Sequence, residues 1–215
     1  MPEKKTKPSE PAPKEMLQVL AQRVSVVVPL GPNRAVEMHR LEKGLLAQTI
    51  QPKEVVVEQG NHHYKNRNRG WQKAKGEMIW FLDSDIVPDS DAFERALEVF
   101  MTTETDAVEG HIYGVIERVF KWGFMSGHIF YSKRMLDAVG GFDERFTDWR
   151  GDTDLGWSIL DAGGLIVYQP LSRAFHPHGS NTRPNLETER LLYDKHPELY
   201  RTAREKHYLQ CLIND

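Results

Sequence analysis

The sequence predicts an α/β fold in which a Rossmann-like, mainly parallel sheet is flanked by helices in a single domain. Three short apolar runs, residues 24–28, 55–57 and 78–82, have the length and the β-branched or aromatic character of buried strands. Residues 33–48 lie between the first two runs and carry apolar side chains at helical spacing. Strands that alternate with helices in this way indicate βαβ units.

Further elements follow from apolar spacing and from the glycines and prolines that end it. The helices expected are one that ends at residues 71–75 before Gly76, one capped by Asp89 or Ser90, residues 132–139, residues 152–162, and a C-terminal segment, 186–213, interrupted near Pro197. One more strand is expected at residues 165–168, with an extension past Pro170 toward Phe175. The second half of the chain is less regular than the first.

The composition is that of a globular protein with nearly balanced charge. The 215 residues include 28 Lys and Arg against 31 Asp and Glu, a formal charge of −3, so no overall positive field favours nucleic acid. A single cysteine, Cys211, excludes a disulfide framework within the chain. No apolar run reaches the roughly 18–20 residues of a membrane-spanning helix, and the N-terminus lacks the apolar core of a secretory signal. We therefore expect a cytoplasmic protein without a transmembrane segment.

The chain divides into three parts by composition. Residues 1–20 are expected to form a disordered tail, since the first 15 residues carry four prolines and seven charged residues and little that a core could bury. A basic arm that grips an anionic partner is the alternative, and three glutamates among the lysines disfavour it. Residues 21–185 form the expected domain, with a first half, 21–100, and a second half, 101–185, and residues 186–215 form a C-terminal helical segment.

The strongest local signal is the sequence Asp83-Ser84-Asp85, which follows the apolar run at residues 78–82. In an open parallel sheet, ligands bind at the C-terminal ends of the strands. Carboxylates are hard oxygen ligands, and Mg²⁺ or Mn²⁺ commonly bridges one or two of them to substrate phosphates. The alternative is a solvated turn in which Asp83 only caps a loop. The pair alone does not decide between the two.

Several motifs in a fixed order favour the first interpretation. Residues 24–29, 55–58, 67–70, 74–77 and 81–85 occur in an order that resembles the nucleotide-binding half of glycosyltransferase family 2, whose fold is called GT-A. Residues 140–144 (GGFDE) and 152–157 (DTDLGW) look like the acceptor side of that family. The resemblance covers about residues 22–180, and it implies a GT-A fold and transfer of a sugar from a nucleotide donor.

The resemblance implies roles for residues on the nucleotide side. The residues it places near the nucleotide are Pro29, Gly31, Glu58, Arg67, Asp83 and Ser84. Asp85 is expected to bind Mg²⁺ or Mn²⁺, together with Asp83 and His176. Gln59 replaces the second of two acidic residues that usually contact the base or ribose, so uracil and guanine both remain open. Lys65 and Arg69 are expected to lie in a solvated loop, and the pair His62-His63 in a polar loop with no metal.

On the acceptor side, Asp152 matches the carboxylate that takes the acceptor hydroxyl proton in inverting members of the family. Gly151 stands where the family usually has a second acidic residue, and Ser158 where a basic residue is common. The alternative for Asp152 is a carboxylate that only stabilises a helix N-terminus. Trp149, Gly127 and His128 are expected to contact the acceptor, and His178 is a weaker candidate beside His176.

The resemblance thus implies a metal-dependent glycosyltransferase that moves a sugar from a UDP- or GDP-sugar to a hydroxyl acceptor, a glycan or a small molecule, with inversion. A nucleotidyltransferase is the enzymatic alternative, although residues 30–34 (LGPNR) lack the usual glycine-rich phosphate loop. A non-catalytic module that binds a nucleotide sugar is the other alternative, and the departures at Gly151 and Ser158 keep it open.

Overall fold

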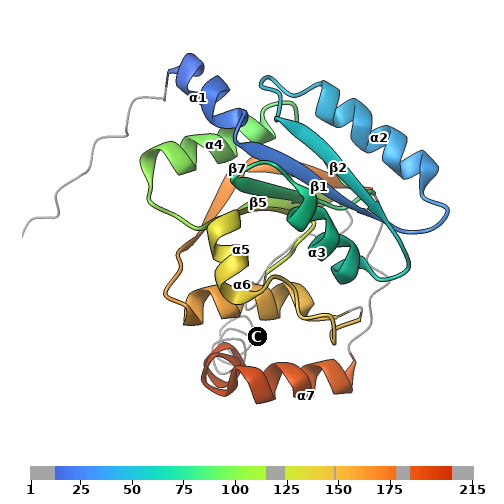
Figure 1. Cartoon of the computed structure of the whole chain (residues 1–215), viewed down its shortest axis with the longest axis vertical. Helices are drawn as coiled ribbons and strands as arrows, with labels where there is room; N and C mark the ends of the chain where they lie inside the picture. Colours follow the sequence, from blue (N-terminus) through green and yellow to red (C-terminus); the bar gives the residue numbers. More distant parts are fainter. Residues whose placement is uncertain (1–12, 115–123, 148, 178–184, 205–215) are drawn as a thin grey trace, which may run out of the picture.

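The computed structural model describes residues 13–114, 124–147, 149–177 and 185–204. They form one seven-stranded sheet with helices on both faces (Figure 1). The strands are β1 (Val24–Leu30), β2 (Glu54–Gln59), β3 (Met78–Leu82), β4 (Val87–Pro88), β5 (Ala107–Gly114), β6 (His128–Ser132) and β7 (Ile166–His176). The helices are α1 (Lys14–Ala21), α2 (Ala35–Leu46), α3 (His63–Lys73), α4 (Ala92–Thr102), α5 (Lys133–Val139), α6 (Gly151–Asp161) and α7 (Leu186–Lys195).

The strand order β2-β1-β3-β6-β5-β7-β4 confirms the expected α/β class and corrects its strand directions. β1 runs parallel to both β2 and β3, as βαβ units require. β6 is antiparallel to β3 and to β5, and β4 is antiparallel to β7, so the sheet is mixed rather than mainly parallel. β5 and β7 form a parallel pair beyond β6, with an irregularity between Gly110 and His111.

Two apolar cores lie on opposite faces of the sheet, and β3 contributes to both. Trp80 packs on the face covered by α1, α2 and α4, whereas Phe81 packs on the face covered by α3, α5 and α6. All five residues of β3 are buried. A strand covered on both faces reads as a continuous apolar run, which explains why residues 78–82 could be recognised from sequence.

The N-terminal boundary differs from the expectation of a tail over residues 1–20. Lys14–Ala21 is helical, and α1 packs against α4, as Figure 1 shows. The Leu17 side chain lies in the first core with only 1% of the residue exposed, and Ala21 is fully buried. Leu17 and Ala21 supply the apolar contacts of α1 with this core, so the packed fold includes α1.

The C-terminal segment is helical in its described part. α7 covers Leu186–Lys195, and residues 197–204 form a further helical stretch after Pro197 breaks the first one. In Figure 1, α7 runs below α6, on the side away from α1 and α2. None of the described helices has the length and apolarity that crossing a bilayer requires.

Candidate active site

The Asp83-Ser84-Asp85 sequence follows directly on β3, at the end of the strand where ligands bind in such sheets. The Asp83 N–H donates to the Gly127 carbonyl at 3.1 Å, which ties this turn to the segment that leads into β6. A Cβ on Gly127 would lie 2.7 Å from Ile86 Cδ1 and 2.9 Å from Asp83 Oδ2, so a larger residue here would shift the Asp83 carboxylate. Ser84 is buried within the turn.

Arg67 extends from α3 to the same place. Its guanidinium forms an ion pair with Asp83, and its side chain is only 4% exposed. The guanidinium carbon lies 5.7 Å from the ring centre of Tyr64 and 5.6 Å from that of Phe142, the aromatic residue of the expected GGFDE motif. Nε and Nη1 of Arg67 are buried and have no hydrogen-bond partner. Buried donors are normally satisfied, so two unpartnered donors mark a place prepared for an acceptor group.

Asp85 and His176 face each other across the ends of β3 and β7. His176 Nε2 lies 3.7 Å from Asp85 Oδ1, and an Arg34 nitrogen lies 3.5 Å from Asp85 Oδ2. Burial, followed by the charge of Asp83, raises the pKa of the Asp85 carboxyl. His176 Nδ1 is buried without a partner.

The donor atoms present suit a hard divalent cation. Asp83 and Asp85 offer carboxylate oxygens and His176 offers an imidazole nitrogen, the ligand types that Mg²⁺ and Mn²⁺ accept. Among the residues that the structure describes, no group of three such side chains converges tightly enough to define a metal centre. The Arg67 guanidinium instead pairs with Asp83.

Asp152 lies in the first turn of α6, beside the segment that leads into β6. Its Oδ2 accepts from the Ser126 N–H at 3.4 Å and its Oδ1 from the Thr153 N–H at 2.9 Å. Its charge also acts on the hydroxyls of Tyr64 and Tyr131, whose pKa values burial raises first and Asp152 raises further. The carboxylate is therefore in electrostatic contact with the Arg67 region rather than isolated at a helix end.

The glycine that precedes Asp152 has a structural reason. A Cβ on Gly151 would lie 2.4 Å from the Tyr64 ring, and the Gly151 N–H donates to the Tyr64 hydroxyl at 3.0 Å. The phenol of Tyr64 thus fills the space that a side chain at position 151 would need. An acidic residue there is sterically incompatible with Tyr64 in its present place.

His63 lies close to Arg67 and Tyr64, although the sequence analysis gave it no role in the site. His62 and His63 do not lie in a loop: His62 caps α3 with Nδ1 accepting the Lys65 N–H at 3.4 Å, and His63 is the first residue of the helix. Burial and the neighbouring Arg67 lower the pKa of His63 to about 3, so its imidazole is neutral. Its ring centre lies 4.1 Å from that of Tyr64. No local pattern distinguishes it from His62.

The residues expected around the base lie where β1 and β2 end. Pro29 pairs in register with Glu58, and Gly31 follows β1. The carboxylate of Glu58 accepts from Arg69 Nε at 3.2 Å and from Lys73 Nζ at 2.5 Å, so it ties β2 to α3. Arg69 is therefore a structural cation on a helix, not part of a solvated loop. The contact of Glu58 with a nucleotide stays a prediction.

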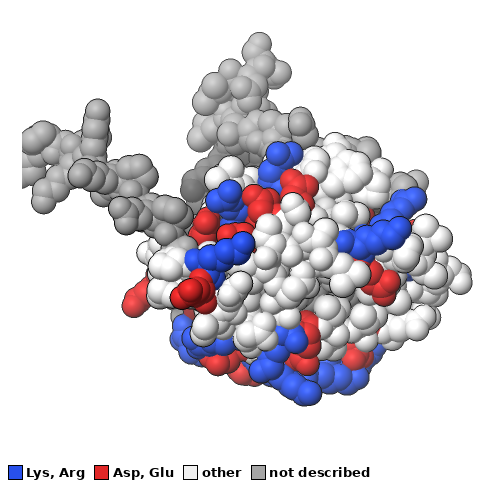
Figure 2. All heavy atoms as spheres, turned by 90° about the horizontal axis from the view of Figure 1, so that it is seen from above, with Lys and Arg blue, Asp and Glu red and all other residues white. Residues whose placement is uncertain are grey.

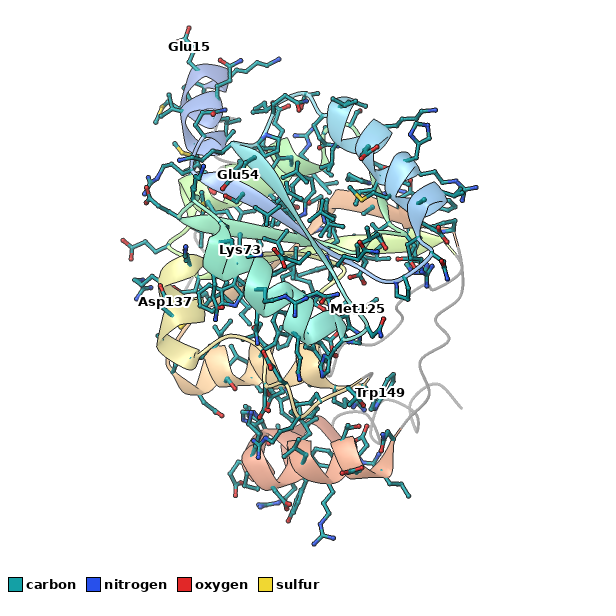
Figure 3. The ribbon with its side chains drawn as sticks, turned by 45° about the vertical axis from the view of Figure 1, so that its right-hand side comes forward. Glu15, Glu54, Lys73, Met125, Asp137 and Trp149 are labelled. Carbon is teal, nitrogen blue, oxygen red and sulfur yellow. The ribbon has the colours of Figure 1, made fainter. Side chains whose placement is uncertain are left out.

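Two of the residues expected at the acceptor have hydrogen-bond partners within the protein. His128 is fully buried on the same face of the sheet as Trp80. The Trp80 indole N–H donates to its Nδ1 at 3.0 Å, and its Nε2 lies 3.1 Å from the Ser172 carbonyl oxygen. Burial lowers the pKa of His128 to about 4, so it is a neutral core histidine. Trp149, labelled in Figure 3, donates its indole N–H to Glu189 of α7 at 2.7 Å. His178 lies outside the described residues.

The surface charge is mixed. In Figure 2, Lys and Arg side chains lie among Asp and Glu over the face shown. Several charged residues of the chain form ion pairs, such as Arg95 with Asp91 at 3.2 Å. This distribution agrees with the small net charge of the sequence.

The sequence model described as "Glycosyl transferase family 2" matches residues 33–155, more than half of the chain. The chain belongs to glycosyl transferase family 2. A pre-mycofactocin glycosyltransferase of Mycobacterium tuberculosis, found in two strains, is 24% identical over 143 residues. The match covers 54% of this family 2 chain and 30% of the relative, so the chain spans less than a third of that relative's length.

Solved structures share the fold at low identity, which confirms the GT-A class of this family 2 chain. TarS of S. aureus, in its 1–349 form with UDP-GlcNAc, superposes with a TM-score of 0.65 at 16% identity, covering 80% of this chain and 66% of that one. GalNAc-T7, crystallised with UDP, GalNAc and Mn²⁺, gives a TM-score of 0.63 at 14% identity and covers 80% and 47% of the two chains.

Proposed function

We propose that this family 2 chain transfers a sugar from a nucleoside diphosphate sugar to a hydroxyl acceptor. The observation that carries the proposal is the buried Arg67 guanidinium, with two unpartnered donors beside the acidic turn that ends β3. Guanidinium binds phosphate oxygens through parallel N–H donors, and its charge complements a diphosphate. The family assignment makes a diphosphate-linked sugar the matching ligand.

The proposal includes a divalent cation. Asp85, Asp83 and His176 would hold Mg²⁺ or Mn²⁺, in agreement with their donor atoms and with the raised pKa of Asp85. Such a cation would neutralise charge that develops on the departing nucleoside diphosphate. The GalNAc-T7 structure, which contains Mn²⁺ and UDP, supports this part of the proposal by likeness of fold.

The proposed reaction is a single displacement with inversion. The acceptor oxygen forms a bond to the anomeric carbon while its proton passes to the Asp152 carboxylate. The bond between the anomeric carbon and the diphosphate oxygen breaks, and its electron pair leaves with the nucleoside diphosphate. Arg67 binds the charge of the leaving group, and the neutral His63 adds a polar group beside it without a competing charge.

The donor proposed is a UDP- or GDP-sugar, and the acceptor a glycan or a small molecule with a free hydroxyl. The UDP-GlcNAc complex of TarS supports a nucleotide-sugar donor. The two alternatives, nucleotidyl transfer and binding without turnover, differ in products: nucleotidyl transfer from the same donor would release a sugar 1-phosphate, whereas a binding module releases nothing.

The test is an assay of the chain with UDP-, GDP- and dTDP-sugars, Mg²⁺ or Mn²⁺, and a mixed panel of hydroxyl acceptors. We expect release of a nucleoside diphosphate with at least one donor and a product heavier than its acceptor by one sugar residue in mass spectrometry. Release of a sugar 1-phosphate in place of the nucleoside diphosphate would favour the nucleotidyltransferase. Tight nucleotide-sugar binding by calorimetry without any released diphosphate would favour the binding module.

A further inference from the structure

Helix α7 contacts the chain just before Asp152. Glu189, in the first turn of α7, accepts the Trp149 indole N–H at 2.7 Å and the Arg150 Nε–H at 2.6 Å on its Oε1. Its Oε2 accepts the Tyr200 hydroxyl at 2.9 Å. One carboxylate therefore joins α7 and the helical stretch after it to the two residues that lead into α6. Figure 3 shows Trp149 between the ribbons of α6 and α7.

The backbone at this point has a conformation that its sequence does not favour. Arg150 has a φ of +70°, in the left-handed region that residues with a side chain seldom adopt. The Arg150 carbonyl accepts the Asp154 N–H at 2.8 Å, the first hydrogen bond of α6. The start of α6, and with it the direction of Asp152, thus depends on a strained residue that needs support from elsewhere.

The support for Arg150 comes from its side chain. The guanidinium lies 4.8 Å from the centre of the Trp149 ring and forms an ion pair with Glu189, and both charged side chains are largely buried. Burial alone raises the pKa of Glu189, but the hydrogen bonds from Trp149 and Arg150 lower it overall, so the carboxylate is ionised at neutral pH. A charged pair that is shielded from water holds its geometry better than a solvated one.

Helix α7 also contacts α6 at Asp154, two residues after Asp152. Asp154 has a side chain that is only 2% exposed, and it accepts from Lys195 Nζ at 2.7 Å and from His196 Nε2 at 3.0 Å. α7 and the residue that follows it therefore contact α6 on both sides of Asp152 along the chain. None of these contacts involves the Arg67 region.

We propose that Glu189 is a positioning residue for Asp152: it fixes the strained Trp149-Arg150 segment and so aims the Asp152 carboxylate at the acceptor hydroxyl. This inference rests on the proposed function, in which Asp152 takes the acceptor proton. It also gives Trp149 a different role from stacking on a sugar, since the indole N–H is part of the same support. The C-terminal segment is then part of the catalytic domain rather than an appendage.

The test is a double-mutant cycle with Glu189→Ala, Asp152→Asn and the two combined, and with Glu187→Ala as the control. Glu187 is exposed on the same turn of α7. We expect Glu189→Ala to lower kcat for transfer about 10- to 100-fold, the effect of a misplacement on the order of 1 Å, while the donor KM changes less than about twofold. Glu189→Gln keeps an acceptor oxygen and should recover part of the rate. Glu187→Ala should behave as wild type.

In the Asp152→Asn background, the change at Glu189 should have no further effect, because the group it positions has already lost its function. An equal loss in both backgrounds, or a parallel loss of donor binding, would contradict the positioning role. If Asp152→Asn transfers at the wild-type rate, the proposed base is wrong, whatever Glu189 does.

A second measurement needs no turnover. Hydrogen exchange of the peptides that cover residues 149–156, followed by mass spectrometry, should be faster in Glu189→Ala than in wild type, whereas exchange around Arg67 and Asp83 should be unchanged. Glu187→Ala should exchange as wild type in both regions. Unaltered exchange at residues 149–156 would show that Glu189 does not hold this segment, and it would overturn the inference.

Discussion

The Arg67 guanidinium and the Asp83 carboxylate form an ion pair that joins α3 to the turn after β3. The pair uses Nη2 of Arg67, and Nε and Nη1 are left buried without a partner. A ligand that supplies oxygens to these two donors forms hydrogen bonds with groups that folding has already removed from water. Such a prepared donor set binds an anion with little reorganisation.

Replacing Arg67 tests this directly. Arg67→Lys keeps one positive charge but cannot present several donors in one plane. Charged hydrogen bonds contribute about 1.5–3 kcal/mol each, so nucleoside diphosphate affinity should fall about 10- to 100-fold in calorimetry. Lys65→Gln, an exposed position on the same helix, is the control and should bind as wild type. Equal affinities in all three proteins would exclude Arg67 from the donor site.

The cation predicted at Asp85 can be tested without any acceptor. Nucleoside diphosphate binding should be tighter with Mn²⁺ or Mg²⁺ than with EDTA, because the carboxylates and the diphosphate repel each other without a cation. In Asp85→Asn, which nearly preserves size, the affinity with Mn²⁺ should fall to the value that wild type has in EDTA. A wild-type protein that binds equally well in EDTA does not use the cation for donor binding.

Asp152→Asn should separate the two halves of the site. The amide cannot take a proton, so the transfer rate should fall about 10²- to 10⁴-fold, the usual contribution of general-base help. Donor affinity should stay near wild type, since Arg67 and Asp85 are unchanged. The product should have the anomeric configuration opposite to that of the donor, as read by NMR, and retention would reject the single displacement.

The role of α1 predicts a stability effect far from the site. Leu17 is buried against the first core, so Leu17→Ala should lower the free energy of unfolding by about 2–5 kcal/mol in urea titrations. Val19 lies on the same helix and is 70% exposed, and Val19→Ala should change stability by less than about 0.5 kcal/mol. Similar small effects of both changes would mean that α1 is not part of the cooperative fold.

His196 predicts how stability varies with pH. Burial alone lowers its pKa, but hydrogen bonds to Asp154 and Asp161 raise it overall above the ordinary 6.5. Since the folded pKa is the higher one, the stabilisation is fully present below about pH 6.5 and is lost as the pH rises through the folded value. Asp154, Asp161 and the nearby Lys195 are the charged groups around the ring. In His196→Gln, the melting temperature should no longer fall over this pH range.

The first half of the fold could be predicted from sequence because β1 and β3 are buried on both faces and read as continuous apolar runs, and because α2 and α4 are amphipathic. β5 was not predicted, since Glu109, Gly110 and His111 interrupt its apolar pattern and acquire their place only from tertiary contacts. Gly110 is one such case: a Cβ there would lie 2.2 Å from the His128 ring, a contact between strands that no local pattern encodes.

The site shows the same division. Asp83 and Asp85 could be recognised because charged residues at the end of a strand stand out against apolar neighbours, whereas Arg67 lies among polar residues of α3 and was assigned only from the family resemblance. The place of His128 could have been recognised from strand alternation, because it shares a face with Phe130, which packs in the first core. The hydrogen bond of Trp149 to Glu189 could not be predicted, because the two residues are 40 positions apart in the chain.

Tyr64 and Gly151 now depend on each other, and this limits how the chain can evolve. An acidic residue introduced at position 151 alone would displace the phenol, and Tyr64 also packs on Phe142, next to Arg67. Gly151→Glu should therefore impair the donor side as well as the acceptor side, whereas a small residue at position 64 would have to come first. A second carboxylate beside Asp152 would therefore require a change at position 64 as well as at position 151, because the Tyr64 ring leaves no room for a side chain at position 151.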